Sequence, residues 1–228
     1  MSNENSYQRG PGGQEIALEA RASDEARLSS PSVSRNREAI ADVFCGHMPA
    51  KGNILEIASG TGEHVVTLAG RLPDVMFHPG DPDPVSRASI AAWTDHVQAT
   101  NIAPPHAIDV IADRPLTEHH TLFQGLLCIN MIHIAPFAAT KGLFAYAQSA
   151  LAPGGSLFLY GPFARNGVHT APSNADFDAS LKSRNADWGV RDLDRQVTPL
   201  AHDHGFDRKD IIQMPANNLA VIFQLGSR

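Results

Sequence analysis

The chain has 228 residues, and its 18 Lys and Arg against 24 Asp and Glu give a formal net charge of −6. That length suits a single domain, and an apolar fraction of 43% is enough to build a sizeable core. A negative net charge argues against a nucleic-acid partner, because phosphate backbones are bound by a basic face. No apolar run approaches the ~20 residues of a membrane span, so we expect no membrane partner.

The cellular compartment and the domain limits follow from simple features. Two cysteines, Cys45 and Cys128, are too few for a disulfide scaffold and favour a reducing compartment. The N-terminus lacks the apolar segment of a secretory signal, so we expect a cytoplasmic protein. Residues 1–28 are polar and show no periodicity, which predicts a flexible tail or lid before a single domain at 29–228. The sequence leaves the oligomeric state open.

Helical and strand patterns alternate along most of the chain. In chain order they predict a helix from residue 34 that Pro49 ends, a strand at 53–58, a helix through 65–72, a strand at 75–78, a helix at 84–99, strands at 106–109 and 125–130, a helix at 137–151, a strand at 156–160, a helix ending near 204, and two strands at 210–214 and 219–225.

Such alternation predicts a parallel sheet with helices on both faces. The last two strands are separated by only four residues, 215–218, and so short a connection allows only an antiparallel pair. We therefore expect an α/β fold. It is a doubly wound, Rossmann-like sheet of seven strands, mostly parallel, with one antiparallel strand near the edge.

A glycine-rich turn follows the first expected strand. Gly60 and Gly62 remove side chains, so a ligand can lie against the backbone, and the next helix offers free N–H groups. Asp81 ends the second strand, where a carboxylate can accept both hydroxyls of a ribose. The alternative for Asp81 is turn chemistry in the Gly-Asp-Pro-Asp-Pro segment. The turn predicts a nucleoside ligand at the carboxyl ends of the strands.

The same segment discriminates among nucleosides. A dinucleotide fingerprint needs a third glycine at position 65, where this chain has Val65. Glu56 would repel a phosphate but can meet a cationic ligand. These features favour S-adenosylmethionine, which carries a sulfonium and no phosphate. Asp109, at the end of the third expected strand, can accept from the adenine amino group or can be a turn or helix-cap acid.

With this turn, the chain resembles the class I S-adenosylmethionine-dependent methyltransferases. It is more closely similar to the methyltransferase-like 26 family, whose bacterial homologues are known as a domain of unknown function. The shared motifs span nearly everything after the tail: Ser30-Pro31, 35–37, 55–64, 128–134, 160–163, Ser173-Asn174, 176–178, Trp188-Gly189, Arg191-Asp192 and 214–218. The family usually has lysine where this chain has Arg37, and serine where it has Gly80. The resemblance implies the fold and the cofactor but no settled substrate.

Three groups of residues are candidates for the site. The cofactor-binding candidates are Glu56, Ala58, Gly60, Gly62, Asp81, Asp109 and Asn130. The catalytic candidates are His133, Tyr160 and Arg191. The substrate-binding candidates are Arg35, Asn36, Arg37, Asn174 and Asp176. No histidine pair at i, i+4 with a nearby acid indicates a metal site, so we expect none.

Each acceptor-side candidate has a structural alternative. His133 can orient a substrate or accept a proton, or it can cap the loop after its strand. Tyr160 can contact substrate or pack at the pocket rim. Arg191 can bind an anionic group or form a local ion pair or cap, and Asn217 and Asn218 can be ordinary hairpin residues.

The function predicted from these residues is methyl transfer from S-adenosylmethionine to a small polar molecule. Once the sheet is built, only the N-terminal segment and residues 161–190 remain to form an acceptor site, too few for a macromolecule-docking domain. A non-catalytic S-adenosylmethionine-binding module is the alternative. An NAD-dependent oxidoreductase is disfavoured by Val65 and by the antiparallel closing pair. The sequence does not identify the acceptor atom.

Overall fold

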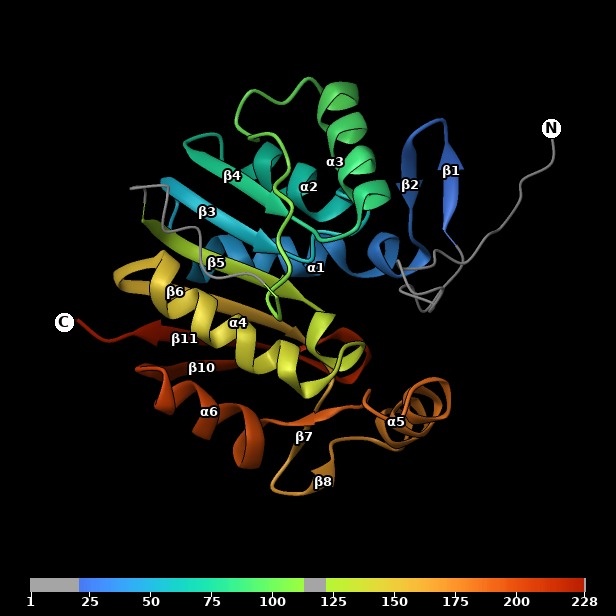
Figure 1. The fold of residues 1–228 in the computed structure, drawn as a ribbon, viewed down its shortest axis with the longest axis vertical. Coiled ribbons are helices and arrows are strands. Elements are labelled where there is room, and N and C mark those ends of the chain that lie inside the picture. The colour runs from blue at the N-terminus through green and yellow to red at the C-terminus, as the bar shows by residue number, and fades with distance from the viewer. Residues whose placement is uncertain (1–20, 113–121, 228) are drawn as a thin grey trace. The chain divides into compact units, whose positions relative to one another are not determined.

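The computed structural model describes residues 21–112 and 122–227. The chain forms two compact units, Met1–Ile108 and Asp109–Arg228, which are taken in turn (Figure 1). Within the described residues the fold is α/β, with a mostly parallel central sheet of six strands. Among the described helices, none is both long and apolar enough to cross a membrane.

The first unit opens with a hairpin. Its elements are β1 (Ala22–Asp24), β2 (Arg27–Ser29), α1 (Pro31–His47), β3 (Gly52–Ile57), α2 (Glu63–Arg71), β4 (Val75–Gly80) and α3 (Pro84–Val97). β1 and β2 are antiparallel, and β2 lies beside α3 (Figure 1). The hairpin occupies the last part of the segment expected to be a tail or lid, residues 1–28, and extends one residue beyond it; residues 1–20 are outside the described residues.

The core of the first unit is built around two parallel strands. β3 pairs with β4 in a register that sets Ile54 opposite Phe77. Phe44 of α1 reaches Phe77, with ring centroids 6.4 Å apart, and Leu68 of α2 is also buried. Each such side chain contributes about 1.5–3 kcal/mol by leaving water. This packing holds the carboxyl ends of β3 and β4 side by side.

The strand expected at 106–109 is absent from the structure, and among the described residues the central sheet has six strands where the sequence predicted seven. Here the chain makes only two isolated parallel bridges to β4, Phe77 to Ile102 and Gly80 to His106. Pro104 and Pro105 stand between the bridges and have no backbone N–H to donate to a ladder. The segment follows the edge of β4 without becoming a strand.

The second unit contains the other four strands of the central sheet. Its elements are β5 (Phe123–Ile129), α4 (Phe137–Ala150), β6 (Leu151–Gly161), β7 (Phe163–Arg165), β8 (Val168–His169), α5 (Pro172–Arg184), β9 (Arg191–Asp192), α6 (Thr198–Asp203), β10 (Phe206–Met214) and β11 (Asn218–Leu225), with short helical turns at Met131–His133, Leu193–Val197 and Pro215–Asn217.

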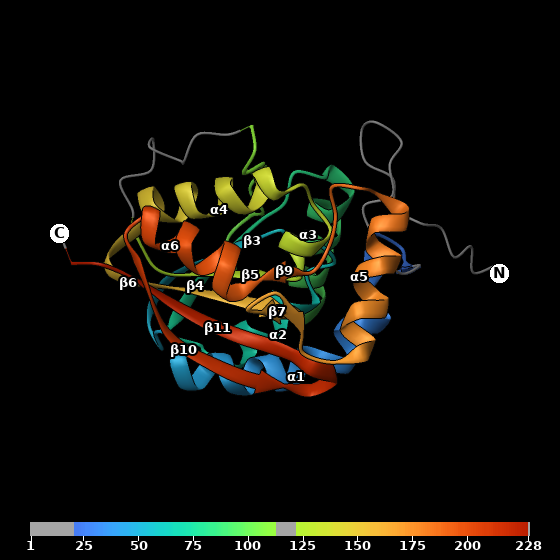
Figure 2. The same ribbon diagram turned by 90° about the horizontal axis from the view of Figure 1, so that it is seen from below.

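These strands run in the order β5-β6-β11-β10. β5 and β6 are parallel, whereas β11 is antiparallel to both β6 and β10. Helices α4 and α6 lie side by side over one face of these strands (Figure 2). Phe144 of α4 packs edge-on against Phe206 and Phe223, at centroid distances of 5.7 and 5.5 Å.

A small second sheet follows β6. β7 pairs antiparallel with β8 and parallel with β9, which places Phe163 opposite Arg191. Helix α5 stands apart from α4 and α6 (Figure 2). This arrangement brings the polar residues after β6 back to the carboxyl ends of β5 and β6.

Candidate functional site

The loop after β3 bears the glycines predicted to face a ligand. Ala58, Gly60 and Gly62 all have left-handed backbone conformations, with φ of 58°, 58° and 91°. A Cβ at Gly62 would lie 2.8 Å from Cα of Ile90 in α3, so Gly62 is required by helix packing. At Gly60 the nearest atom to such a Cβ would be Nη2 of Arg21, at the ordinary contact distance of 3.6 Å, so helix packing does not require this glycine. The two glycines therefore have different roles.

Asp81 directly follows β4 beside this loop, and the protein orients both of its carboxylate oxygens. Oδ2 accepts the N–H of Gly60 and Oδ1 accepts the N–H of Asp83, each at 2.9 Å. Burial raises the pKa of Asp81, and these two backbone donors oppose that shift. Each oxygen keeps a lone pair, so the carboxylate can accept two further hydroxyl donors.

Glu56, late in β3, is a buried acid. Only 2% of it is exposed, and Oε2 has no hydrogen-bond partner among the described residues. Burial raises the pKa of Glu56 to about 8, the hydrogen bond from Ser59 opposes the shift, and the charge of Asp81 adds to it. A cationic ligand would favour the ionised form, because opposite charge stabilises a carboxylate.

Ser59 is a loop residue that the sequence analysis missed. Its backbone N–H donates to the carbonyl of Gly80 at 3.1 Å, and its Oγ accepts from the N–H of Gly80 at 3.1 Å. Ser59 thereby fastens the loop to the end of β4, next to Asp81. Its position between Ala58 and Gly60, inside the glycine-rich turn, was the feature of the sequence that could have identified it.

Asp109 adopts the turn role rather than a strand-end position. Its Oδ1 accepts the N–H of Ile111 at 2.9 Å, and its carbonyl accepts the N–H of Ala112 at 3.2 Å. These contacts match the turn alternative, because an aspartate that bonds the amide two residues on is typical of such turns.

The predicted substrate residues of α1 have unlike environments. Arg35 is exposed, and Arg37 is 3.6 Å from Glu38. Asn36 has a buried Oδ1 with no partner among the described residues. Burial and, secondarily, the charge of Arg37 lower the pKa of His64 to about 4. His64 is the second residue of α2, so Arg37 is close to the start of that helix.

In the second unit, Asn130, His133 and Gly161 meet at the carboxyl ends of β5 and β6. The N–H of Asn130 donates to the carbonyl of Tyr160 at 2.8 Å, and Asn130 itself is left-handed with φ 59°. A Cβ at Gly161 would lie 2.4 Å from Nε2 of His133 and 3.2 Å from Oδ1 of Asn130. Gly161 is therefore another site residue that sequence reasoning missed.

His133 is buried and uncharged at neutral pH. It is 1% exposed, and neither ring nitrogen has a partner among the described residues. Burial and then the charge of Arg191 lower the pKa of His133 to about 3. So low a pKa makes a weak proton acceptor at neutral pH, which favours the orienting role over the proton-accepting one.

Arg191 is occupied by backbone carbonyls. Its Nε donates to Ile132 at 2.9 Å, and its Nη2 donates to Ala135 at 2.6 Å and to Asp187 at 2.9 Å. All three of these partners are backbone carbonyls, and a contact of Arg191 with an anionic group of the substrate stays a prediction. Because its bonds hold both sides of His133, Arg191 acts as a positioning residue for that loop.

Tyr160 and the two asparagines of the last hairpin belong to one hydrogen-bonded group with Asn174. The hydroxyl of buried Tyr160 accepts from Nδ2 of Asn218 at 3.0 Å. Nδ2 of Asn174 donates to the carbonyl of Asn217 at 3.0 Å, and Asn217 donates to Ser173 at 3.1 Å. These bonds tie the start of α5 to the hairpin.

Helix α5 presents Asp178, not the predicted Asp176, to the interior. Asn174, Asp178 and Leu181 are buried at i, i+4 and i+7, whereas Asp176 is exposed. Asp178 accepts the N–H of Val190 at 2.8 Å and Nζ of Lys182 at 2.6 Å. Helical periodicity from Asn174 was the signal that identifies Asp178.

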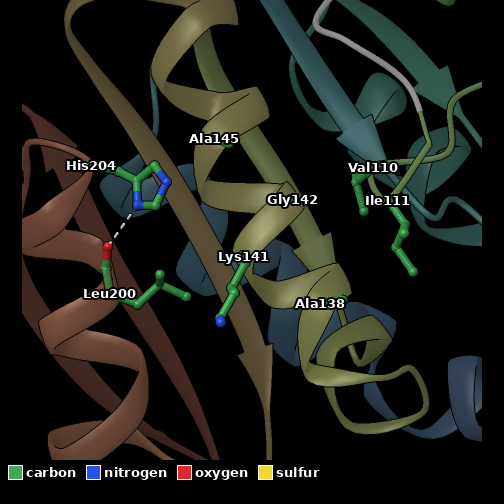
Figure 3. Close-up of a pocket in the computed structure, with 8 residues that line it drawn as sticks. All are labelled: Val110, Ile111, Ala138, Lys141, Gly142, Ala145, Leu200 and His204. Atoms are coloured by element: carbon green, nitrogen blue, oxygen red, sulfur yellow. Dashed lines mark hydrogen bonds between the residues drawn. The ribbon is translucent and has the colours of Figure 1, made fainter.

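A separate apolar groove of about 390 Å³ lies in the second unit, where α4 and α6 meet (Figure 3). It is lined by Val110, Ile111, Ala138, Lys141, Gly142, Ala145, Leu200 and His204. Nδ1 of His204 is bonded to the carbonyl of Leu200 at 2.9 Å. None of the predicted site residues lines this groove. Within residues 21–112 and 122–227, no cluster of three or more His, Cys, Asp or Glu forms a metal site.

The chain belongs to the family described as "Protein of unknown function (DUF938)", whose model matches residues 27–225. This match covers nearly all of the described residues.

Several solved structures share the fold. An O-methyltransferase family protein from Burkholderia thailandensis has a TM-score of 0.71 at 14% identity, over 86% of this chain and 58% of that one. An O-methyltransferase family 2 protein from Planctomyces limnophilus, in complex with apigenin, has a TM-score of 0.69 at 19% identity, over 85% and 59%. CalO1, a methyltransferase of calicheamicin biosynthesis in its SAH-bound form, has a TM-score of 0.67 at 13% identity, over 86% and 54%.

This chain thus spans between 54% and 59% of the length of these three proteins. At identities of 11–19%, the likeness shows a methyltransferase fold and no more.

Proposed function

We propose that this member of the DUF938 family is an S-adenosylmethionine-dependent methyltransferase that acts on a small polar molecule in the cytoplasm. The observation that carries the proposal is the Asp81 carboxylate. Both of its oxygens are held by backbone N–H groups, one of them from Gly60 in the glycine-rich loop after β3.

The residues of the first unit suit this cofactor. The remaining lone pairs of Asp81 can accept the two ribose hydroxyls. The buried Glu56 suits a cationic ligand, which repays the burial of its charge, and would disfavour a phosphate. S-adenosylmethionine, when bound, supplies an activated methyl group on its sulfonium. Asn130 stays a predicted cofactor contact, whereas the bonds of Asp109 to Ile111 and Ala112 favour its turn role.

The second unit carries the groups that we assign to the acceptor. Asn174 and Asp178 are buried polar side chains, and the neutral imidazole of His133 has one donor and one acceptor nitrogen to offer. Methyl transfer is a direct displacement, so the protein mainly has to hold the acceptor in line and exclude water. A neutral histidine can orient a hydroxyl or an amine without taking its proton.

The methyltransferase fold agrees with this proposal. Because many functions share a fold, the proposal is argued from the residues of the site. The low number of cysteines, Cys45 and Cys128, supports the cytoplasmic compartment.

The test is calorimetric titration with S-adenosylmethionine, S-adenosylhomocysteine and NAD. We expect the first two to bind and NAD not to bind, and binding of NAD alone would refute the cofactor. Transfer of a labelled methyl group from S-adenosylmethionine to a metabolite extract then tests the activity. Cofactor binding without any transfer would identify the chain as a non-catalytic binding module.

A further inference from the structure

The N-terminal hairpin β1–β2 is docked on α3 in a defined register. The N–H of Leu28 donates to Oγ of Ser89 at 2.8 Å, and Nε1 of Trp93 donates to the carbonyl of Leu28 at 2.7 Å. The guanidinium of Arg27 lies 5.2 Å from the centroid of the Trp93 ring. Both backbone groups of Leu28 are therefore satisfied by side chains of α3.

Ser89 connects this hairpin to the glycine loop, residues 58–62. The serine is 0% exposed, and the hydroxyl that accepts from Leu28 donates to the carbonyl of Thr61 at 2.7 Å. Thr61 lies between Gly60 and Gly62. A single buried hydroxyl thus bridges the hairpin and the loop.

A second bridge reaches the same threonine through Glu63. The N–H of Ser30, directly after the hairpin, donates to Oε2 of Glu63 at 2.8 Å. The hydroxyl of Thr61 donates to the same carboxylate oxygen at 3.0 Å. Leu28 is therefore linked to the carbonyl of Thr61 through Ser89, and Ser30 is linked to the hydroxyl of Thr61 through Glu63.

The hairpin also brings a positive charge to the loop. Nη2 of Arg21 is 3.6 Å from the position of a Cβ at Gly60, and Nη1 donates to Oγ of Ser86 at 3.5 Å. Burial lowers the pKa of Arg21, and the nearby charges of Asp81, Asp83 and Glu63 oppose that shift. Arg21 therefore lies close to the group that we assign to the ribose.

We propose that Ser89 is a positioning residue of the cofactor site. Through its hydroxyl, docking of the hairpin β1–β2 on α3 is coupled to binding of the cofactor at residues 58–62. The identity of the ligand rests on the proposed function. Losing the Ser89 hydroxyl leaves the Thr61 carbonyl and the Leu28 N–H without partners, which loosens the loop and the hairpin together. Such coupling is reciprocal: if docking of the hairpin raises the affinity for the cofactor by some factor, the bound cofactor raises the equilibrium constant for docking by the same factor.

The experiment uses the full chain, with S-adenosylhomocysteine as the probe. Ser89→Ala removes the bridge. Thr94→Val is the matched control, because the Thr94 hydroxyl donates to the carbonyl of Ile90 within α3 itself. Calorimetry gives the Kd of each protein, and hydrogen exchange reports on the amides of residues 22–29 with and without the probe.

We expect Ser89→Ala to raise the Kd at least tenfold and Thr94→Val to change it less than twofold. In the wild type, the probe should slow exchange of the Leu28 amide at least tenfold. A wild type that binds the probe without slowing this exchange overturns the coupling and leaves the cofactor assignment standing. So does a folded Ser89→Ala variant with the wild-type Kd, even if it melts earlier.

The wild-type exchange measurement decides the matter if Ser89→Ala does not fold. A wild-type chain that binds neither S-adenosylmethionine nor S-adenosylhomocysteine overturns the coupling and the proposed function together.

Discussion

Replacing Asp81 with asparagine tests the central contact of the proposed cofactor site. The side chain keeps its shape, but it loses its charge and presents an amide NH₂ group to one of the two backbone donors that Asp81 accepts at 2.9 Å. Asp81 is buried, so water cannot easily replace the lost partner. A hydrogen bond to a charged group is worth about 1.5–3 kcal/mol. Losing one such bond to ribose corresponds to roughly 10- to 150-fold weaker binding.

The assay is calorimetric titration of S-adenosylhomocysteine into the wild type, Asp81→Asn and the exposed control Asp74→Asn, which makes the same chemical change elsewhere in the first unit. An analogue that lacks the ribose hydroxyls should be weakened less by Asp81→Asn than S-adenosylhomocysteine is, because it has no ribose bond to lose. If folded Asp81→Asn binds S-adenosylhomocysteine within twofold of the wild type, Asp81 is a turn residue only.

The remaining predictions concern pH, packing and the acceptor side. Burial raises the pKa of Glu56 to about 8, so ionising this side chain opposes folding. In thermal melts, the wild type should therefore lose stability relative to Glu56→Gln as pH rises from 5 to 8. Melting temperatures of the two proteins that change in parallel with pH would contradict the raised pKa. A Cβ at Gly142 would lie 1.9 Å from a backbone oxygen, whereas Gly70 has nothing within 4 Å. Urea unfolding should show that Gly142→Ala destabilises by about 1–3 kcal/mol, and that Gly70→Ala does not. Asp178→Asn should lower turnover of an identified substrate at unchanged cofactor Kd, and an equal effect of Asp176→Asn would refute the inward role of Asp178.

Local patterns in the sequence were sufficient for most of the architecture. The alternation of helices and strands has short-range causes, so the sequence predicted an α/β fold, and the four residues between the last strands required an antiparallel pair. The missing strand at 106–109 shows the limit of such patterns. Its apolar residues resemble a strand, but Pro104 and Pro105 precede them, and pairing needs donors at successive positions.

The candidate site divides in the same way. The turn from Glu56 to Gly62 is one contiguous segment, and Asp81 follows the next strand, so local patterns could identify both. The structure brings Gly60 and Asp81 into contact. Asp178 depended on helix α5, which the sequence analysis did not predict; once the helix is known, its periodicity separates Asp178 from Asp176.

Only the tertiary structure decided what several polar residues contact. The bonds of Arg191 to Ile132 and Ala135 span 59 and 56 positions, and the bridge from Leu28 to Ser89 spans 61. The same is true of the buried His133, whose pKa is set mainly by the removal of water. Residue type specifies which bonds a side chain can make, but long-range packing selects the partner and the degree of burial, and no local pattern encodes either.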